Sequence, residues 1–108
     1  MNIGVDIEET KRFLDNTYDN HRTFYEKIFT EGEIKYCLSK VNSHLHFAVR
    51  FCAKEAAIKA MNNQKIDLQD IEIKIVDNKP RIILPLGMKG DVSMSHTQNI
   101  AIATVIIF

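Results

Sequence analysis

The segment RFCAKEAAIKAM, residues 50–61, carries four charged side chains among residues that are almost all apolar or small. If the segment is a helix, its charged positions are spread around the axis with apolar residues between them, so no broad polar face remains for solvent. We therefore expect this helix to be largely buried. Unpaired buried charge is strongly disfavoured, so these side chains need partners, and a metal ion or a charged ligand would suit them. The four are Arg50, Lys54, Glu55 and Lys59.

Two carboxylates could supply hard oxygen ligands to a cation. Asp6 lies in the segment NIGVDIE, whose alternating apolar residues predict a half-buried strand with Asp6 pointing away from its apolar face. If the helix packs on the sheet, Asp6 and Glu55 approach each other. Mg²⁺ is usually held by such carboxylates, with water and phosphate oxygens completing an octahedron. The simpler alternatives are a strand-end carboxylate for Asp6 and an i,i+4 ion pair between Glu55 and Lys59.

Basic residues of the same helix could bind phosphate. Arg50 and Lys54 lie one turn apart on one side, and Lys59 lies one turn beyond Glu55. A guanidinium forks onto phosphate oxygens and an ammonium acts as a compact charge, so this set would suit a polyphosphate at an interface. The alternative is that the long side chains simply reach solvent. His96, in SMSHT near a predicted strand end, is either a phosphate donor or an ordinary satisfied histidine.

The elements that must position these residues can be predicted from periodicity. Residues 23–29 favour a short helix, and TEGE at 30–33 has the capping-box pattern that begins another, ending near Ser39. The main helix is predicted from Ser43 to about Met61. Strand-like patterns then follow, at 71–77, 81–86, 91–97 and 100–108. One strand, a helical half and a run of antiparallel strands predict an α+β domain.

Length and composition limit the number of domains and the kinds of partner that this chain can have. A chain of 108 residues forms one domain, here 1–108. Lys+Arg and Asp+Glu balance at 14 each, which gives no global field for nucleic acid or an anionic membrane. Without a signal-like or membrane-spanning segment, we expect a cytoplasmic protein with reduced thiols at Cys37 and Cys52. The last strand is apolar on both faces, so we expect a second copy of the chain to cover one face.

Three segments together resemble one family, the short holo-[acyl-carrier-protein] synthases of the 4'-phosphopantetheinyl transferase type. GVDIEE is similar to their N-terminal G-(I/V)-D-(I/L) strand, and RFCAKEAAIKAM to their R-F-(A/S)-x-K-E-A-x-x-K-A helix. VSMSHTQNIAIATVI resembles their S-(I/L)-S-H hairpin. The order, spacing and total length agree over nearly the whole chain. The resemblance implies the transferase fold, arranged as a homotrimer with its sites at the subunit interfaces.

The resemblance also implies roles for single residues. Asp6 and Glu55 would bind Mg²⁺ beside the pyrophosphate of coenzyme A, and Lys59 would lie near the reacting phosphates. The residues expected around the nucleotide and its phosphates are Arg50, His96 and Lys54. The implied reaction moves the 4'-phosphopantetheine arm of coenzyme A to a serine hydroxyl of an acyl carrier protein and releases 3',5'-ADP. The proton acceptor is either Glu55 or a metal-bound water held by Asp6.

Other features of the sequence leave alternatives open. Acidic carriers should meet basic residues, and Lys11, Arg12 and Arg22 are the candidates. The chain has Asn62 and Asn63 where the family commonly has a glycine-containing turn, and asparagine can adopt the left-handed conformation. Two other classes of function compete with the transferase: a coenzyme A-binding module without transfer activity, and a purely structural oligomer. The sequence does not distinguish carriers of fatty-acid metabolism from those of secondary metabolism, or Mg²⁺ from Mn²⁺.

Overall fold

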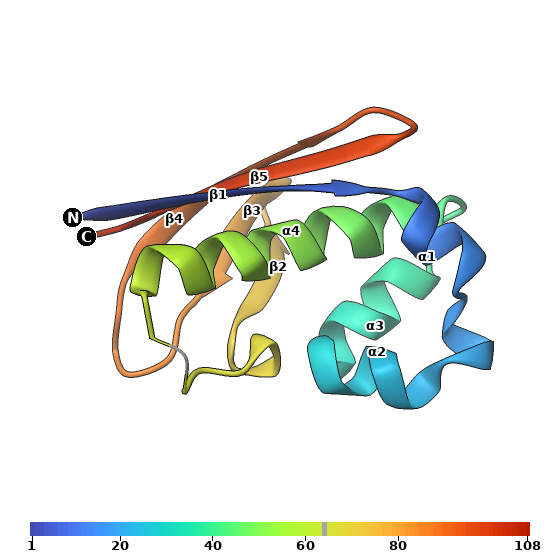
Figure 1. Cartoon of the computed structure of the whole chain (residues 1–108), viewed down its shortest axis with the longest axis horizontal. Coiled ribbons are helices and arrows are strands. Elements are labelled where there is room, and N and C mark those ends of the chain that lie inside the picture. Colours follow the sequence, from blue (N-terminus) through green and yellow to red (C-terminus); the bar gives the residue numbers. More distant parts are fainter. Residues whose placement is uncertain (64) are drawn as a thin grey trace.

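A computed structural model describes residues 1–63 and 65–108 of the chain. Its central feature is one long helix, α4 (Ser43–Met61), which lies along a three-stranded antiparallel sheet (Figure 1). The sheet has the order β1-β5-β4 and consists of β1 (Asn2–Glu9), β5 (Ile100–Ile107) and β4 (Gly90–His96). This arrangement confirms the predicted α+β class and the predicted bounds of the main helix.

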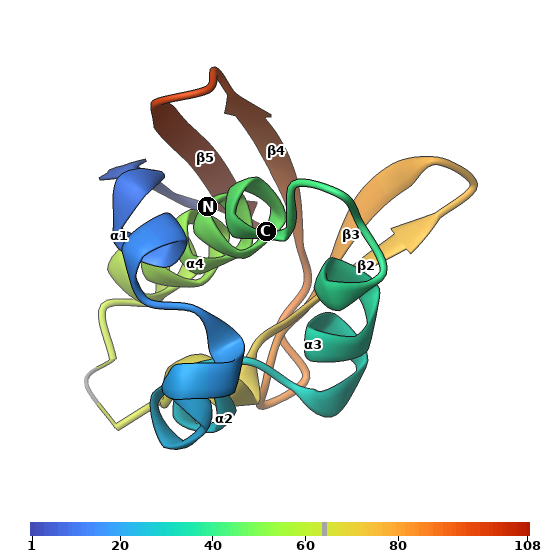
Figure 2. The same ribbon diagram turned by 90° about the vertical axis from the view of Figure 1, so that its right-hand side faces the viewer.

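The remaining strands form a separate hairpin. β2 (Glu72–Val76) pairs antiparallel with β3 (Lys79–Ile83), and Figure 2 shows this hairpin projecting away from the main sheet. Asp77 and Asn78 both have positive φ, 52° and 64°, which is the conformation that a two-residue turn needs to match the strand twist. The strand order was not predictable from the sequence pattern, which indicated the four later strands but not their division into two sheets.

Short helices cover one end of α4. The predicted capping box is confirmed: Thr30 N donates to Glu33 Oε1 at 2.8 Å, and Glu33 N donates to Thr30 Oγ1 at 3.2 Å. Aromatic rings from this region pack against α4: Tyr25 and Phe29 lie against Phe47, and Phe13 lies against Phe51. These short elements are α1 (Lys11–Asp15), α2 (Arg22–Ile28), α3 (Glu31–Leu38) and the 3₁₀ turns Tyr18–Asn20 and Leu68–Asp70.

The end of α4 confirms the expected turn. Asn62 follows the helix with φ 52° and ψ 41°, the left-handed conformation that commonly ends a helix. Asparagine therefore makes this turn without a glycine, as its tolerance of that conformation allows. Cys37 and Cys52 are both free and buried, in agreement with the prediction of reduced thiols. In the part of the chain that the structure describes, no helix has both the length and the apolar character to cross a membrane.

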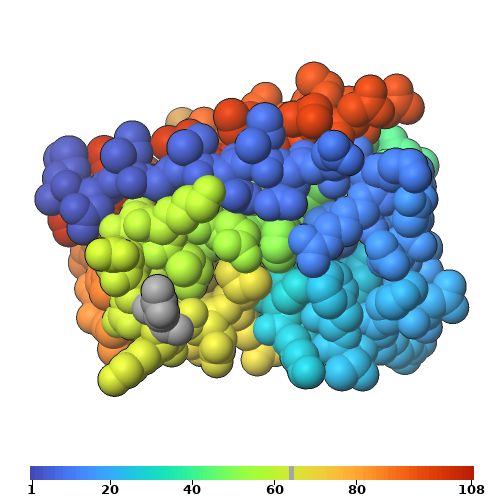
Figure 3. All heavy atoms as spheres, viewed as in Figure 1, coloured from blue at the N-terminus to red at the C-terminus, as the bar shows by residue number. Residues whose placement is uncertain are grey.

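One prediction about β1 was wrong. We expected its apolar side chains to form the buried face, but Ile3 and Ile7 are 69% and 62% exposed in the single chain. The opposite face, with Gly4 and Asp6, packs on α4. The approach is very close, because a Cβ added at Gly4 would lie 2.0 Å from the backbone oxygen of Ala56. The glycine lets strand and helix touch here, and strand alternation places Asp6 on the same face, toward the helix (Figure 3 shows β1 lying along α4).

Candidate active site

Asp6 and Lys59 meet where β1 crosses α4. Lys59 Nζ donates to Asp6 Oδ1 at 3.0 Å and to the Val5 carbonyl at 3.1 Å. The Asp6 side chain is 10% exposed, and its second oxygen, Oδ2, is buried without a hydrogen-bond partner. The Lys59 ammonium is largely open to solvent, so it can bind Asp6 and still face an incoming ligand. The structure therefore brings these two predicted residues together.

Two further carboxylates, those of Glu55 and Glu8, lie beside Asp6 in this corner, by which we mean the junction of β1 and α4. The pKa of Glu55 is raised by burial and by the negative charge of Asp6, against the opposing effects of Lys59 and Arg12. The pKa of Glu8 is raised to about 7 by burial first, then by its interaction with Asp6, with a smaller contribution from Glu55. Glu8 was missed in the sequence, although its position two residues after Asp6 places both side chains on one face of a strand.

The residues of this corner fit a divalent cation. The buried, unpartnered oxygen of Asp6 needs a hydrogen-bond donor or a cation, and the neighbouring Glu55 offers a second hard ligand. Among the described residues, no three His, Cys, Asp or Glu side chains already converge on one point as a finished metal site. Mutual repulsion keeps carboxylates apart when no cation lies between them, so an open arrangement is the expected one.

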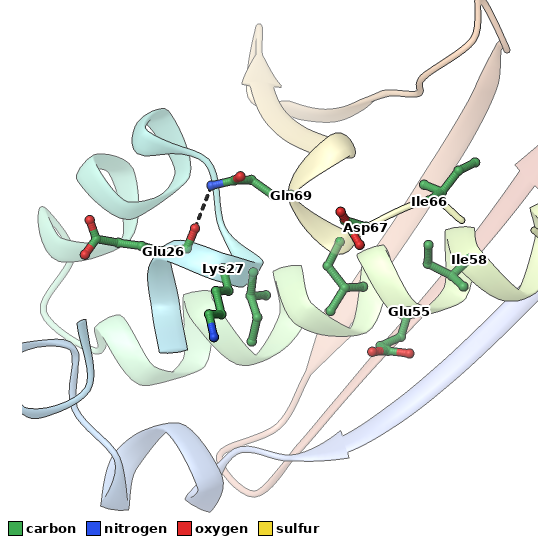
Figure 4. Close-up of a pocket in the computed structure, with 9 residues that line it drawn as sticks. Glu26, Lys27, Glu55, Ile58, Ile66, Asp67 and Gln69 are labelled. Carbon is green, nitrogen blue, oxygen red and sulfur yellow. Dashed lines mark hydrogen bonds between the residues drawn. The ribbon is translucent and has the colours of Figure 1, made fainter. Parts of the chain in front are cut away.

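A pocket of about 710 Å³ opens beside Glu55, between α2, α4 and the segment that leads to β2. Its apolar lining comes from Ile28, Ile58, Ile66 and Leu68, and its polar groups include Gln69 (Figure 4). Gln69 Nε2 donates to the Glu26 carbonyl at 2.6 Å and so ties the 3₁₀ turn to α2. A ligand held at Glu55 could extend an apolar chain with amide groups into this space.

A second, basic cluster lies on the other side of α4. The Arg50 guanidinium is buried, with Cζ 4.4 Å from the centre of the Tyr36 ring and Nη1 donating to the His46 carbonyl at 3.2 Å. The rings of His46 and His96 are 6.5 Å apart. Burial, followed by the charges of Arg50 and His96, lowers the pKa of His46. His96 itself is exposed, so it is the member of this cluster that a ligand reaches most easily.

Lys54 was predicted to lie near the nucleotide, but the structure places it in the protein interior. Its side chain is 0% exposed, and Nζ lies 2.5 Å from Glu33 Oε1. The same ammonium donates to the carbonyls of Ile28, Leu68 and Ile71 at 2.9, 3.1 and 2.7 Å. This geometry contradicts a contact with coenzyme A, because no part of the ammonium is accessible and all its donors are used. The charge of Lys54 is neutralised inside the protein, and its role is structural.

The predicted carrier-binding residues also have partners within the chain. Lys11 pairs with Asp15 at 2.9 Å and Arg22 pairs with Asp19 at 3.4 Å, both at the surface. Arg12 stacks its guanidinium over aromatic rings, 5.0 Å from the centre of Phe51. Its positive charge also acts on Glu8 and Glu55. These three basic side chains of α1 and α2 are therefore exposed, but nearby acidic residues partly neutralise their charge.

One chain alone does not unite the two clusters. Asp6 lies on β1 and His96 on β4, the two outer strands of the sheet, with β5 between them. Their partners on β5 are Ala103 and Ala101, so both residues lie on the face that α4 covers and flank that helix on opposite sides. A ligand that touches both clusters has to be bound by two copies of the chain or to pass around α4.

Comparison with known proteins identifies the family. Residues 2–105 match the family model described as the 4'-phosphopantetheinyl transferase superfamily. A holo-[acyl-carrier-protein] synthase of Thermodesulfovibrio yellowstonii is 40% identical over 108 residues, which cover 97% of this chain and 96% of that protein.

Solved structures agree with this match. The holo-(acyl-carrier-protein) synthase of Bacillus anthracis, in complex with CoA (3',5'-ADP), has a TM-score of 0.83 at 30% identity, covering 98% of this chain and 94% of that one. The Helicobacter pylori enzyme in complex with coenzyme A has a TM-score of 0.85 at 27% identity, covering 98% and 99%. The match extends over the whole fold, including β1, α4 and the β4–β5 hairpin that carry the site. The chain therefore belongs to the 4'-phosphopantetheinyl transferase superfamily.

Proposed function

We propose that this protein is a holo-[acyl-carrier-protein] synthase. It transfers the 4'-phosphopantetheine arm of coenzyme A to a serine hydroxyl of an apo-acyl carrier protein, with release of 3',5'-ADP. The observation that carries this proposal is the buried, unpartnered oxygen of Asp6 beside Glu55 and Lys59. A chain that covers 96% of a related synthase and places Asp6, Glu55 and Lys59 of its motifs together is equipped for metal-dependent phosphoryl chemistry.

Residues of β1 and α4 have separate roles in the proposed reaction. Asp6 and Glu55 would hold Mg²⁺, and the chemistry that the cation would supply is compensation of the negative charge on the pyrophosphate of coenzyme A. Lys59, fixed at its inner side by Asp6 and the Val5 carbonyl, presents its remaining N–H donor to a phosphate oxygen and stabilises the charge that develops there. A base must accept the proton of the attacking serine, and the candidates are Glu55 and a water molecule held by Asp6.

The other parts of coenzyme A have places consistent with this assignment. The pocket beside Glu55 takes the phosphopantetheine arm, whose alternating methylene and amide groups match the apolar lining and Gln69. The nucleotide and its phosphates lie at the basic cluster, where His96 is exposed and Arg50 adds positive charge behind it. Lys54 is left out of this ligand set because it is fully buried.

The proposed assembly is a homotrimer of single-domain chains with sites at the subunit interfaces. The outer face of the main sheet supports it, since Ile3, Val5 and Ile7 of β1 and Ile102 of β5 are exposed together. The placement of Asp6 and His96 on opposite sides of α4 supports shared sites, because a neighbouring chain can bring its own His96 to Asp6. The expected cytoplasmic location stays a prediction.

The proposal is tested by the mass of the carrier. With Mg²⁺ and coenzyme A, the protein is expected to add one phosphopantetheine group to an apo-acyl carrier protein from its own cell. A chelator is expected to stop the addition. Coenzyme A binding without any change in carrier mass would favour a binding module, and neither binding nor transfer would favour a structural oligomer.

A further inference from the structure

The helix α4 buries two cationic side chains, and only one of them has a carboxylate partner. Lys54 forms an ion pair with Glu33 inside the protein. Arg50 is 2% exposed, yet in the described part of the chain the ion pairs within 4.0 Å do not include it. A buried charge without a counter-charge is disfavoured. The fold therefore retains a positive charge at Arg50 that packing alone does not explain.

The hydrogen-bond donors of Arg50 are only partly used. Its Nη1 donates to the carbonyl of His46 at 3.2 Å, and its Nε is buried without a hydrogen-bond partner among the described residues. A guanidinium has five N–H donors, and a carbonyl satisfies one of them without cancelling the charge. Buried donors normally have partners, so this side chain needs acceptors that the chain itself does not supply. An anionic ligand would supply them.

An aromatic ring holds Arg50 in place. The guanidinium carbon Cζ lies 4.4 Å from the centre of the Tyr36 ring, well within the distance at which a ring face attracts a cation. Tyr36 is on α3, is partly buried and packs against the aromatic core. Its ring carries no net charge, so it fixes the guanidinium without neutralising it. This is the difference from Lys54, which a carboxylate both holds and neutralises.

The same ring gathers other groups that are or can become positive. The ammonium of Lys40, an exposed residue, lies 4.8 Å from the centre of the Tyr36 ring, and the ring of His46 lies 6.0 Å from it, edge to face. His46 in turn lies 6.5 Å from His96. Positive groups repel one another, so gathering them around one ring favours an anion at this place.

We propose that Tyr36 is a positioning residue for Arg50 in the binding of the nucleotide end of coenzyme A. This inference rests on the proposed function and adds a residue to its nucleotide site. The ring keeps the guanidinium behind the basic cluster, where its charge attracts a phosphate group that contacts the exposed His96. Asp6 and His96 flank α4 on opposite sides, so Tyr36 acts on binding and not on the reacting phosphate.

The test compares two ligands that together make up coenzyme A. Binding of 3',5'-ADP and of 4'-phosphopantetheine to the complete protein with Mg²⁺ is measured by isothermal titration calorimetry. Tyr36→Leu is expected to weaken 3',5'-ADP binding about tenfold, which corresponds to roughly 1.4 kcal/mol, and to leave 4'-phosphopantetheine binding unchanged. Wild-type affinity for 3',5'-ADP, or equal losses for both ligands, would overturn the proposal.

Carrier modification gives a second readout of the same variant. Because Tyr36 acts through the bound nucleotide, Tyr36→Leu is expected to raise KM for coenzyme A about tenfold while kcat stays within about twofold of wild type. A loss confined to kcat would contradict a role in nucleotide binding.

Tyr18→Leu is the matched control. Tyr18 is also a partly buried tyrosine that packs on the aromatic core, and Arg22 Cζ lies 5.2 Å from the centre of its ring. Arg22, however, has a carboxylate partner, Asp19, at 3.4 Å. Tyr18→Leu therefore removes a similar ring and should leave 3',5'-ADP binding unchanged. An equal loss in both variants would show general damage to the core and would contradict the positioning role of Tyr36.

A further pair of variants separates the charge of the ring face from its shape and does not require that Tyr36→Leu folds. Tyr36→Phe keeps the ring face and should retain wild-type affinity for 3',5'-ADP. Replacement of Tyr36 by trifluorophenylalanine keeps nearly the same shape, but fluorine withdraws electron density from the face. We expect about threefold weaker 3',5'-ADP binding than in Tyr36→Phe. Equal affinities in these two variants would overturn the role of the ring face.

The two proposals fail in different ways. If wild type binds 3',5'-ADP and modifies the carrier while Tyr36→Leu matches it in both, the positioning role is wrong and the transferase stands. If wild type neither binds 3',5'-ADP nor modifies the carrier, both proposals are wrong.

Discussion

Glu8 makes the stability of the metal-free protein depend on pH. Burial and the neighbouring Asp6 raise the pKa of Glu8 from 4.5 to about 7 in the folded state. The folded protein therefore holds this proton more tightly than the unfolded chain. The contribution of Glu8 to stability is fully present below pH 4.5 and is lost as the pH rises through about 7, where the folded state also loses the proton.

The corresponding prediction is a loss of stability between pH 5 and pH 7.5 in chelator. Because Glu8 is partly exposed, solvent screening limits its share to about 1 kcal/mol. Urea unfolding at a series of pH values measures it, with Glu8→Gln as the comparison. The wild-type free energy of unfolding should fall more steeply over this range than that of Glu8→Gln. Parallel curves would contradict the raised pKa.

Two lysines of the same motif have different roles. Lys54 and Lys59 lie on one helix of one motif, yet Lys54 is fully buried against Glu33 and Lys59 is largely exposed beside Asp6. Helical spacing predicts the direction of each side chain but not which neighbouring element covers it. The sequence therefore supported the approach of Asp6 to Glu55, but it did not indicate the ion pair of Asp6 with Lys59, and it misplaced Lys54.

At the scale of elements, Lys54 joins four parts of the fold. Its ammonium forms an ion pair with Glu33 on α3 and donates to carbonyls at the end of α2 and around the 3₁₀ turn before β2. Glu33 Oε2 in turn accepts from Ile73 N on β2 at 2.8 Å. This network holds Ile28 and Leu68, which line the pocket beside Glu55. Lys54 thus shapes the site without touching the ligand.

Removing one member of this buried pair should be costly. Lys54→Met leaves the Glu33 charge and three carbonyls without a partner, so we expect a loss of about 3–5 kcal/mol of unfolding free energy. Urea unfolding at fixed protein concentration measures it. The double variant Lys54→Met/Glu33→Gln should recover part of the loss, since the uncompensated charge is gone. A loss below about 1 kcal/mol in Lys54→Met would show that the pair is not essential.

The elements themselves were largely predictable. The bounds of α4, the capping box at Thr30 and the turn at Asn62 follow from local chemistry that acts within a few residues. The buried face of β1 was not predictable, since alternation shows two faces but not which one a helix covers. The close contact of Gly4 with Ala56 decides it, and that contact joins residues far apart in the sequence.

For the whole molecule, the exposed apolar face of the main sheet implies assembly. We predict a homotrimer in sedimentation equilibrium at micromolar concentration. Ile102→Glu places a charge at the centre of this face, on β5, and should shift the protein toward monomers. Val41→Glu is the control, because Val41 is fully exposed outside the sheet. A wild-type monomer would leave the outer face unexplained and would argue against shared sites.

The central claim is that this chain transfers phosphopantetheine through the cation-binding corner at Asp6. The most direct measurement is the intact mass of an apo-acyl carrier protein from the same cell, followed over time with coenzyme A and increasing Mg²⁺. Asp6→Asn keeps the size of the side chain, and Asp77→Asn in the exposed turn between β2 and β3 is the control. Wild type and Asp77→Asn should convert the carrier at the same rate, while Asp6→Asn should be slower by roughly 100-fold, and chelator should stop all three. Conversion by Asp6→Asn at the wild-type rate, or a carrier left unmodified by wild type in excess Mg²⁺, would contradict the account.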